Sequence, residues 1–146
     1  ALKKVRAAAR MVDGVIAADD SGLEVAALGG RPGVHSARYG GEELDDSERY
    51  KKLLEEMAGV PAGERDARFV AVVAVRFPDG SEKLFTGECR GEISAEPRGN
   101  SGFGYDPVFF LPDRGMTMAQ LDPAEKNSIS HRYHAFRALR AALIEE

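Results

Sequence analysis

The segment that most constrains the fold is the valine-rich run ARFVAVVAVRF at residues 67–77. Valine and phenylalanine favour extended backbone, so this run predicts the longest strand of the chain. The tripeptide PDG at 78–80 is typical of a tight turn. Residues 82–93, EKLFTGECRGEI, then predict the returning strand of a hairpin. The expected sheet therefore contains this hairpin.

Helical patterns lie on both sides of the hairpin. They cover residues 1–12, 45–59, a short helix that starts at Asp122, and 131–146. Gly14 ends the first pattern, and one of the residues Asp45, Asp46 and Ser47 caps the second. Asp122 and Ser130 are placed to cap the last two helices. In the final helix we expect Phe136, Leu139 and Leu143 to form the apolar face.

Shorter apolar runs predict further strands. VIAAD at 15–19 has the pattern of a short buried strand, and VFFLP at 108–112 predicts another. LEVAAL at 23–28 fits either a strand or a turn of helix. Because helices flank a hairpin-containing sheet, we expect an α/β or α+β domain with one mixed central sheet. The length suits a single domain over residues 1–146.

Composition and charge exclude several classes of function. The formal net charge of −4 gives no bulk attraction for a nucleic acid polymer. No apolar run approaches the roughly 20 residues that span a bilayer, so we expect no membrane segment. The single cysteine, Cys89, cannot form an internal disulfide, which fits a cytoplasmic location. We expect Cys89 to be a packed strand residue.

Two adjacent aspartates, Asp19 and Asp20, end the first of these strands, and Gly22 follows shortly after. Successive strand residues point to opposite faces, so both carboxylates reach one site only if the chain turns at Gly22. Paired carboxylates suit Mg²⁺, which takes one or two of them and keeps its other positions for water and substrate phosphate. Alternatively, Asp19 caps a turn and Asp20 is solvated.

A glycine-rich loop, GNSGFGYD, occupies residues 99–106. Glycines let the backbone approach a ligand closely, and the ring of Phe103 offers a flat stacking surface between them. Alternatively, the loop only connects strands, its two aromatic rings pack inward, and Asp106 is a turn residue before Pro107. The loop therefore predicts either a base-binding surface or a packed connection.

A third cluster, EKNSISHRYH, lies at residues 125–134. A helix N-terminus attracts anions, and Lys126, His131 and Arg132 place three cationic donors near one. Alternatively, these residues form a solvated basic cap. Taken together, the three clusters supply acidic metal ligands, a stacking ring and basic donors. A magnesium-dependent enzyme acting on a nucleoside triphosphate needs that combination.

Three stretches carry a resemblance to a known family: ADDSGLEVAALGGRPGVHSARYGGE at 18–42, GFGYDPVFF at 102–110 and EKNSISHR at 125–132. They resemble the inosine/xanthosine triphosphate pyrophosphatases, the Ham1-like house-cleaning nucleotidases. The resemblance implies an elongated two-lobed domain around a long mixed sheet, with the nucleotide in a cleft between the lobes. It also implies a Mg²⁺-dependent homodimer that hydrolyses ITP, dITP and XTP to the monophosphate and pyrophosphate.

The resemblance also assigns site residues. It implies that Asp20 is the metal-associated general base and that Asp19 is its carboxylate neighbour. The residues that it implies for substrate binding are Lys4, Ser21, Phe103, Gly104, Tyr105, Asp106, Lys126, His131 and Arg132. Of these, Lys4 faces the phosphates, and Phe103 is the expected stacking residue.

The beginning of the chain departs from the family pattern. Family members start with a strand and a Thr/Ser-x-Asn-x-x-Lys loop that grips the triphosphate, and we expect this segment to be missing here. Two other functions therefore stay open. One is a non-catalytic nucleotide-binding remnant, and the other is a Maf-like pyrophosphatase acting on modified pyrimidine nucleotides.

Overall fold

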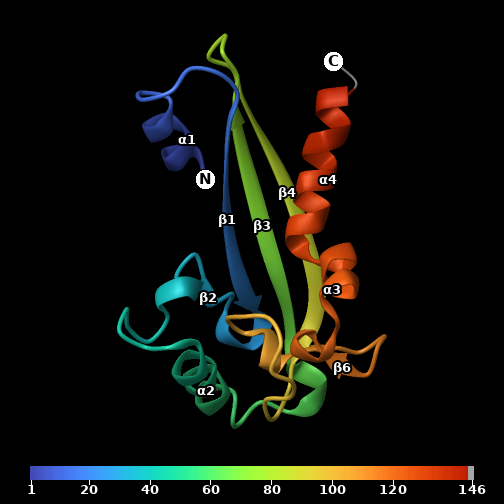
Figure 1. The fold of residues 1–146 in the computed structure, drawn as a ribbon. Coiled ribbons are helices and arrows are strands. Elements are labelled where there is room, and N and C mark those ends of the chain that lie inside the picture. The colour runs from blue at the N-terminus through green and yellow to red at the C-terminus, as the bar shows by residue number, and fades with distance from the viewer. Residues whose placement is uncertain (145–146) are drawn as a thin grey trace.

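Three long strands form the centre of the fold in a computed structural model that describes residues 1–144 (Figure 1). They are β1 (Ile16–Val25), β3 (Asp66–Arg76) and β4 (Glu82–Ile93). β3 and β4 pair along their whole lengths, from Asp66 opposite Glu92 to Arg76 opposite Glu82. The predicted hairpin is therefore confirmed. The last two residues of the predicted C-terminal helix, 145 and 146, lie outside the described residues.

The complete sheet has the strand order β2-β1-β3-β4-β5-β6. Its short strands are β2 (Pro32–Gly33), β5 (Phe109–Leu111) and β6 (Met116–Thr117). The expected α/β fold on a long central sheet is confirmed, but every strand pair within residues 1–144 is antiparallel rather than mixed. Short turns join β3 to β4 and β5 to β6, and such turns connect only antiparallel neighbours.

β1 is longer than the sequence indicates and contains the acidic doublet. Asp19 lies opposite Val73 and Asp20 opposite Val72, so both aspartates sit in the middle of the strand. The predicted strand end and the sharp turn at Gly22 are wrong. The strand continues because β3 offers backbone partners all the way to Val25. Ala26–Leu28 then form a 3₁₀ turn, which resolves the ambiguous segment 23–28.

Within residues 1–144 the structure has four α-helices: α1 (Leu2–Ala8), α2 (Asp46–Glu56), α3 (Pro123–Ile129) and α4 (His131–Ile144). Three predicted caps are confirmed. Asp45 caps α2 in a capping box with Glu48, and Asp122 accepts a hydrogen bond from the amide of Glu125 at the start of α3. Ser130 Oγ accepts from the amide of Tyr133 at 3.1 Å in α4. In the described part of the chain, no helix is both long enough and apolar enough to cross a membrane.

Helix α4 packs along β3 and β4 (Figure 1). The predicted apolar face is partly wrong, because Phe136 and Leu143 are each 45% exposed whereas Ala135 and Leu139 are buried. The reason lies at Gly87 of β4, where an added Cβ would collide with the backbone of α4. This close approach requires a small residue at the contact, and Ala135 provides it.

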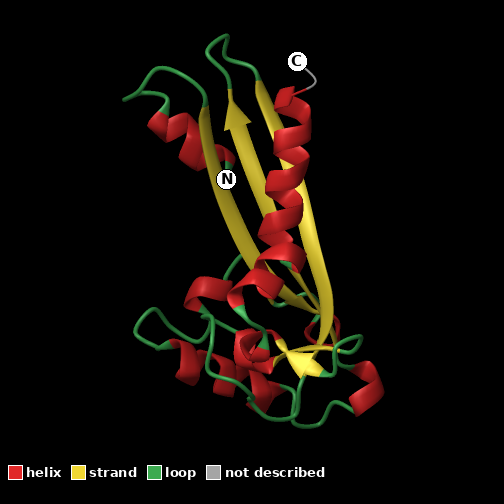
Figure 2. Cartoon of the chain, turned by 45° about the vertical axis from the view of Figure 1, so that its right-hand side comes forward, coloured by secondary structure: helices red, strands yellow, loops and turns green. Residues whose placement is uncertain are grey.

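Helix α1 covers part of the sheet, and the other short elements form a separate lobe. Helix α1 packs on β1 and β3 with Val5 fully buried. The short elements α2, α3, β2 and β6 gather around one end of the long strands, which gives an elongated molecule with a smaller lobe at that end (Figures 1 and 2). The larger core cluster joins this lobe to the sheet and includes Leu23, Leu53, Phe109 and the buried Cys89. Cys89 is thus a packed strand residue, as predicted.

Candidate functional site

The candidate site is a cavity of about 600 Å³ between β1, the 101–106 loop and the junction of α3 with α4. β1 contributes the side chain of Ser21, and the loop contributes Phe103. The start of α2 adds Asp46, and the helix junction adds Lys126 and His131. The cavity therefore joins segments from each of the three sequence clusters.

Two buried polar atoms in this cavity have no hydrogen-bond partner within residues 1–144. They are Ser21 Oγ and His131 Nδ1. A buried polar group that lacks a partner costs about 1–3 kcal/mol, so proteins seldom keep one without a use. Two of them lining one cavity indicate that a polar ligand completes the site.

The His131 ring is held in the wall of the cavity. It stacks on Phe69 of β3, with ring centroids 5.0 Å apart and an interplanar angle of 18°. Burial lowers the pKa of His131 to about 4, with further contributions from Arg132 and Lys126. The imidazole is therefore neutral near pH 7, with one ring nitrogen able to donate a hydrogen bond and the other able to accept one.

Phe103 presents its ring to solvent at the edge of the cavity. The residue is 61% exposed, and two cations lie near the ring. Lys126 Nζ is 4.5 Å from the ring centroid, and Arg132 Cζ is 5.7 Å from it. A flat aromatic surface beside cationic groups suits a planar base attached to phosphates.

The other aromatic residue of the loop has a different environment. Tyr105 is buried, and its hydroxyl donates to the carbonyl oxygen of Ser36 at 2.7 Å. Burial also raises the pKa of Tyr105 above its ordinary value. Inward packing, the alternative for this loop, thus describes Tyr105 but not Phe103.

Asp106 stabilises the loop through contacts of its buried side chain. Its carboxylate is buried, forms an ion pair with Lys126 and accepts a hydrogen bond from the amide of Phe103 at 3.1 Å. Gly102 has φ = +77°, and a Cβ there would collide with the Asp106 carboxylate. The loop therefore needs glycine at position 102, and Asp106 is more than a turn residue.

The two aspartates of the doublet have separate partners. Arg132 Nε donates to Asp19 Oδ2 at 2.9 Å, whereas Asp20 forms an ion pair with Lys4 of α1. Neighbouring strand residues point to opposite faces, so the two carboxylates diverge. The hydrogen bond from Lys4 lowers the pKa of Asp20 below its ordinary value. The structure thus brings Asp20 to Lys4 and Asp19 to Arg132, and does not bring the two carboxylates together.

The donor set limits what cation could bind. Within residues 1–144, His, Cys, Asp and Glu side chains form no group of three or more that could hold a metal ion. The Asp20 side chain is 51% exposed, but its carboxylate is paired with the ammonium group of Lys4, so a cation that binds there has to share or replace that partner. An ion at Asp20 would take most of its ligands from water or substrate, which is how proteins usually bind Mg²⁺.

Sequence reasoning missed several residues of the cavity, among them Asp46 and Ser36. Asp46 Oδ2 accepts a hydrogen bond from the amide of Gly104 at 2.8 Å, across 58 residues of sequence. In the sequence Asp46 was only one of three possible caps for a helix. The Ser36 carbonyl oxygen anchors Tyr105, and no local pattern in the sequence indicates that contact.

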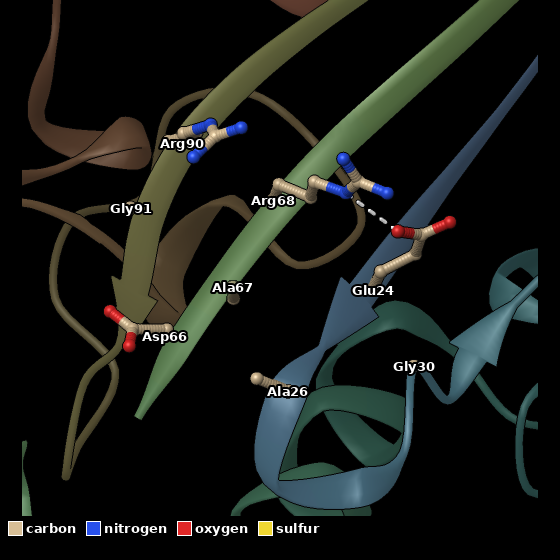
Figure 3. A pocket seen from close by; sticks show the side chains of 8 residues that line it. All are labelled: Glu24, Ala26, Gly30, Asp66, Ala67, Arg68, Arg90 and Gly91. Atoms are coloured by element: carbon tan, nitrogen blue, oxygen red, sulfur yellow. Dashed lines mark hydrogen bonds and ion pairs between the residues drawn. The ribbon is translucent and has the colours of Figure 1, made fainter. Parts of the chain in front are cut away.

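A second cavity of about 460 Å³ is lined by Glu24 of β1, Arg68 of β3 and Arg90 of β4 (Figure 3). Glu24 and Arg68 alternate along their strands with Leu23 and Phe69 of the first cavity, so the second cavity lies on the other face of the sheet. Arg68 in this cavity contacts Glu24 at 2.7 Å and Glu88 at 2.9 Å, and Arg90 contacts Glu88 at 2.8 Å. The arginines are thus already paired with carboxylates of the same surface. Neither of the two buried, unpartnered side-chain atoms found in residues 1–144 belongs to this cavity.

Comparison with known proteins gives consistent results. The family model described as Ham1 family matches residues 1–142. The chain is 53% identical over 139 residues to a protein of Geobacillus kaustophilus named dITP/XTP pyrophosphatase, covering 95% of this chain and 68% of that protein. It is 47% identical over 143 residues to the dITP/XTP pyrophosphatase of Bacillus subtilis, covering 98% and 72%.

Solved structures show the same likeness. The Staphylococcus aureus Ham1 protein is 44% identical and matches with a TM-score of 0.94, covering 99% of this chain and 74% of that one. A HAM1 protein from Coxiella burnetii is 43% identical and also gives a TM-score of 0.94, with 100% and 75% coverage.

Proposed function

The chain belongs to the Ham1 family, and on that premise we propose that it is a nucleoside triphosphate pyrophosphatase. Its proposed substrates are ITP, dITP and XTP, which it hydrolyses between the α- and β-phosphates. The products are the nucleoside monophosphate and pyrophosphate. The proposed biological role is to remove deaminated purine nucleotides from the precursor pool.

The observation that carries the proposal is the incomplete polar cavity beside an exposed aromatic ring. Ser21 Oγ and His131 Nδ1 are buried and unpartnered, and Phe103 is exposed at the same cavity. A purine base stacked on Phe103 would offer polar edge atoms to the cavity wall. Lys126 and Arg132, close to the ring, are placed to contact the rest of the nucleotide.

The proposed preference for oxopurines follows from hydrogen-bond polarity. The 6-keto group of hypoxanthine or xanthine accepts a hydrogen bond, whereas the 6-amino group of adenine donates one. A cavity that presents donors to this position leaves one of them unpaired when adenine enters. The unpaired donor costs about 1–3 kcal/mol, which disfavours ATP by roughly 5- to 150-fold.

Asp20 is the proposed general base of the hydrolysis. Lys4 holds the pKa of Asp20 below its ordinary value, so the carboxylate is ionised near pH 7 but is a weak base. A metal ion that lowers the pKa of the attacking water would reduce this handicap. In the proposed step the oxygen of a water molecule bonds to the α-phosphorus, and one proton of that water passes to Asp20. The bond between the α-phosphorus and the α–β bridging oxygen breaks. Pyrophosphate leaves, and the ammonium group of Lys4 is placed to stabilise charge on the phosphates.

Asp20 is also the residue that would hold Mg²⁺, because its carboxylate is exposed on the side where Lys4 lies. When bound, Mg²⁺ supplies Lewis-acid polarisation and charge neutralisation for the phosphates. A role for Asp19 as a second ligand stays a prediction. Its carboxylate bonds to Arg132, so that role requires Asp19 to exchange this partner.

The test is a product analysis of the full-length protein with ITP, dITP, XTP, GTP and ATP, with and without Mg²⁺. The proposal expects IMP and pyrophosphate from ITP, only with the metal, and much slower hydrolysis of ATP. Orthophosphate as the first product would contradict α–β cleavage, and equal rates with ATP and ITP would contradict the specificity. Saturable ITP binding without pyrophosphate release would instead indicate a non-catalytic binding protein.

The proposal extends to assembly and substrate range. We propose a homodimer, as the resemblance to the family implies, and light scattering in solution tests it. The proposed location is the cytoplasm, which the single cysteine fits. Methylated UTP and CTP belong in the substrate panel, because preferred hydrolysis of either would favour a Maf-like activity. Neither a nucleic acid polymer nor a membrane is a proposed partner.

A further inference from the structure

We propose that Asp46 is a positioning residue that holds the Phe103 loop, residues 102–106, over the cavity. Asp46 lies in the first turn of α2, and its carboxylate lines the same cavity as Phe103. The inference rests on the proposed function, since it assigns to Asp46 a part in presenting the stacking ring to a nucleotide. It does not place Asp46 in contact with the reacting atoms.

The contact itself is a charge-assisted hydrogen bond between two distant segments. The amide of Gly104 donates to Asp46 Oδ2 at 2.8 Å. Gly104 directly follows Phe103, so this bond fixes the backbone on one side of the residue that carries the exposed ring. A hydrogen bond to an ionised carboxylate is stronger than one between neutral groups.

Other anchors of the loop involve the neighbouring amides and side chains. The amide of Phe103 donates to Asp106, and the hydroxyl of Tyr105 donates to Ser36. Packing does little to fix the Phe103 ring, because the residue is 61% exposed. The direction of the ring therefore depends on its backbone anchors, and Asp46 supplies the one that comes from α2.

Asp46 is not needed to begin its own helix. Asp45 is the N-cap, where its side chain accepts from the amide of Glu48 at 2.8 Å. The Glu48 side chain completes the capping box by accepting from the amide of Asp45 at 2.9 Å. The two adjacent aspartates therefore have different roles. Asp45 stabilises the start of α2, and Asp46 binds the amide of Gly104 in the Phe103 loop.

This division provides a matched pair of variants, Asp46→Ala and Asp45→Ala. In the full-length enzyme we expect Asp46→Ala to raise KM for ITP about tenfold while kcat changes less than twofold. Asp46→Asn should restore most of the affinity, because an amide oxygen still accepts from Gly104. Asp45→Ala should lower the melting temperature and leave KM unchanged.

Two further measurements separate positioning from general destabilisation. In a Phe103→Ala background, Asp46→Ala should have almost no additional effect on KM, because both changes act through the same ring. Hydrogen exchange in ligand-free protein should show faster exchange at residues 102–106 in Asp46→Ala than in Asp45→Ala. The exchange result needs no substrate, so it tests the contact even if the enzyme has another activity.

Three outcomes would overturn the inference. The first is an unchanged KM together with unchanged exchange in Asp46→Ala. The second is an equal rise of KM in Asp45→Ala, which would make helix stability the cause. The third is a fall in kcat that Asp46→Asn does not restore, which would indicate that the charge of Asp46 acts on the chemical step.

Discussion

Arg132 on α4 donates from Nε to Asp19 Oδ2 at 2.9 Å and thereby joins residues 113 positions apart in the chain. The bond fixes the guanidinium group, whose carbon atom lies 5.7 Å from the centroid of the Phe103 ring. One carboxylate of the acidic doublet thus positions a cationic group beside Phe103. The other carboxylate, that of Asp20, meets Lys4 on the opposite face of β1.

The first prediction concerns Asp19. Asp19→Asn removes the charge that holds Arg132, and we expect KM for ITP to rise about two- to fivefold, in keeping with a partly exposed ion pair. The value of kcat should stay unchanged, and the Mg²⁺ concentration for half-maximal rate should rise only if Asp19 exchanges Arg132 for the metal ion. Steady-state kinetics over a Mg²⁺ series measures all three. A large increase in the Mg²⁺ requirement would show that Asp19 is a metal ligand instead.

The second prediction concerns Asp20, where Asp20→Asn keeps the size of the side chain and removes its basicity. A general base contributes about 10²- to 10⁴-fold to rate, so we expect kcat to fall at least 100-fold. Binding of ITP, measured by calorimetry, should weaken only modestly. Asp19→Asn is the matched control for charge removal on the same strand. If Asp20→Asn kept more than a tenth of the wild-type rate, Asp20 would not be the base.

The third prediction concerns stacking on Phe103. Stacking of a base on an aromatic side chain contributes about 1–3 kcal/mol, so Phe103→Ala should raise KM for ITP roughly 5- to 150-fold. Phe103→Tyr retains the ring and should stay close to wild type. Because the residue is 61% exposed, neither change should alter the melting temperature much. A KM for Phe103→Ala equal to that of Phe103→Tyr would exclude stacking.

Local patterns in the sequence predict a large part of this fold. The 67–77 and 82–93 strands and the caps at Asp122 and Ser130 are confirmed because each depends on neighbouring residues alone. Segments of all three sequence clusters line one cavity, but Asp19 and Asp20 themselves are not among its lining residues. The predictions that were wrong concern features that depend on residues far apart in the sequence. The length of β1 depends on pairing with β3, which no pattern within residues 15–25 reveals.

The details of the site show the same limit. Helical spacing identified an apolar face on α4, but only the close approach at Gly87 decides that Ala135 rather than Phe136 lies against the sheet. The sequence likewise placed Asp46 near a helix start, and its bond to Gly104 requires two segments that folding brings together. Residue types near a site are thus predictable, whereas their pairings follow from tertiary structure.

The fourth prediction concerns pH and His131. In the folded protein the pKa of His131 is lowered to about 4, chiefly by burial, while an unfolded histidine titrates near pH 6.5. Between these values the unfolded chain binds a proton that the folded chain does not, so falling pH favours unfolding. We expect His131 to remove stability on the order of 1–2 kcal/mol from about pH 6.5 down to about pH 4.

Urea unfolding of the wild type and of His131→Gln across this pH range tests the prediction. The variant cannot take up the proton, so its stability should fall less steeply with decreasing pH than that of the wild type. The difference in the free energy of unfolding between the two proteins should be constant above about pH 7.5. In that range His131 of the wild type is neutral in both the folded and the unfolded state. Parallel pH profiles below pH 6.5 would show that His131 is not the group responsible.

The fifth prediction concerns the contact between Gly87 and α4. A Cβ at position 87 would collide with the carbonyl oxygen of His131 and the amide nitrogen of Ala135, which are backbone atoms that cannot rotate away. Gly87→Ala should therefore destabilise the protein by about 1–3 kcal/mol. Because α4 begins at His131, its displacement should also move His131 and Arg132 and raise KM for ITP.

Gly63→Ala is the control, since a Cβ there meets no atom within 4 Å. Thermal unfolding and kinetics of both variants decide the matter, and equal behaviour of the two would mean that α4 does not depend on this close approach.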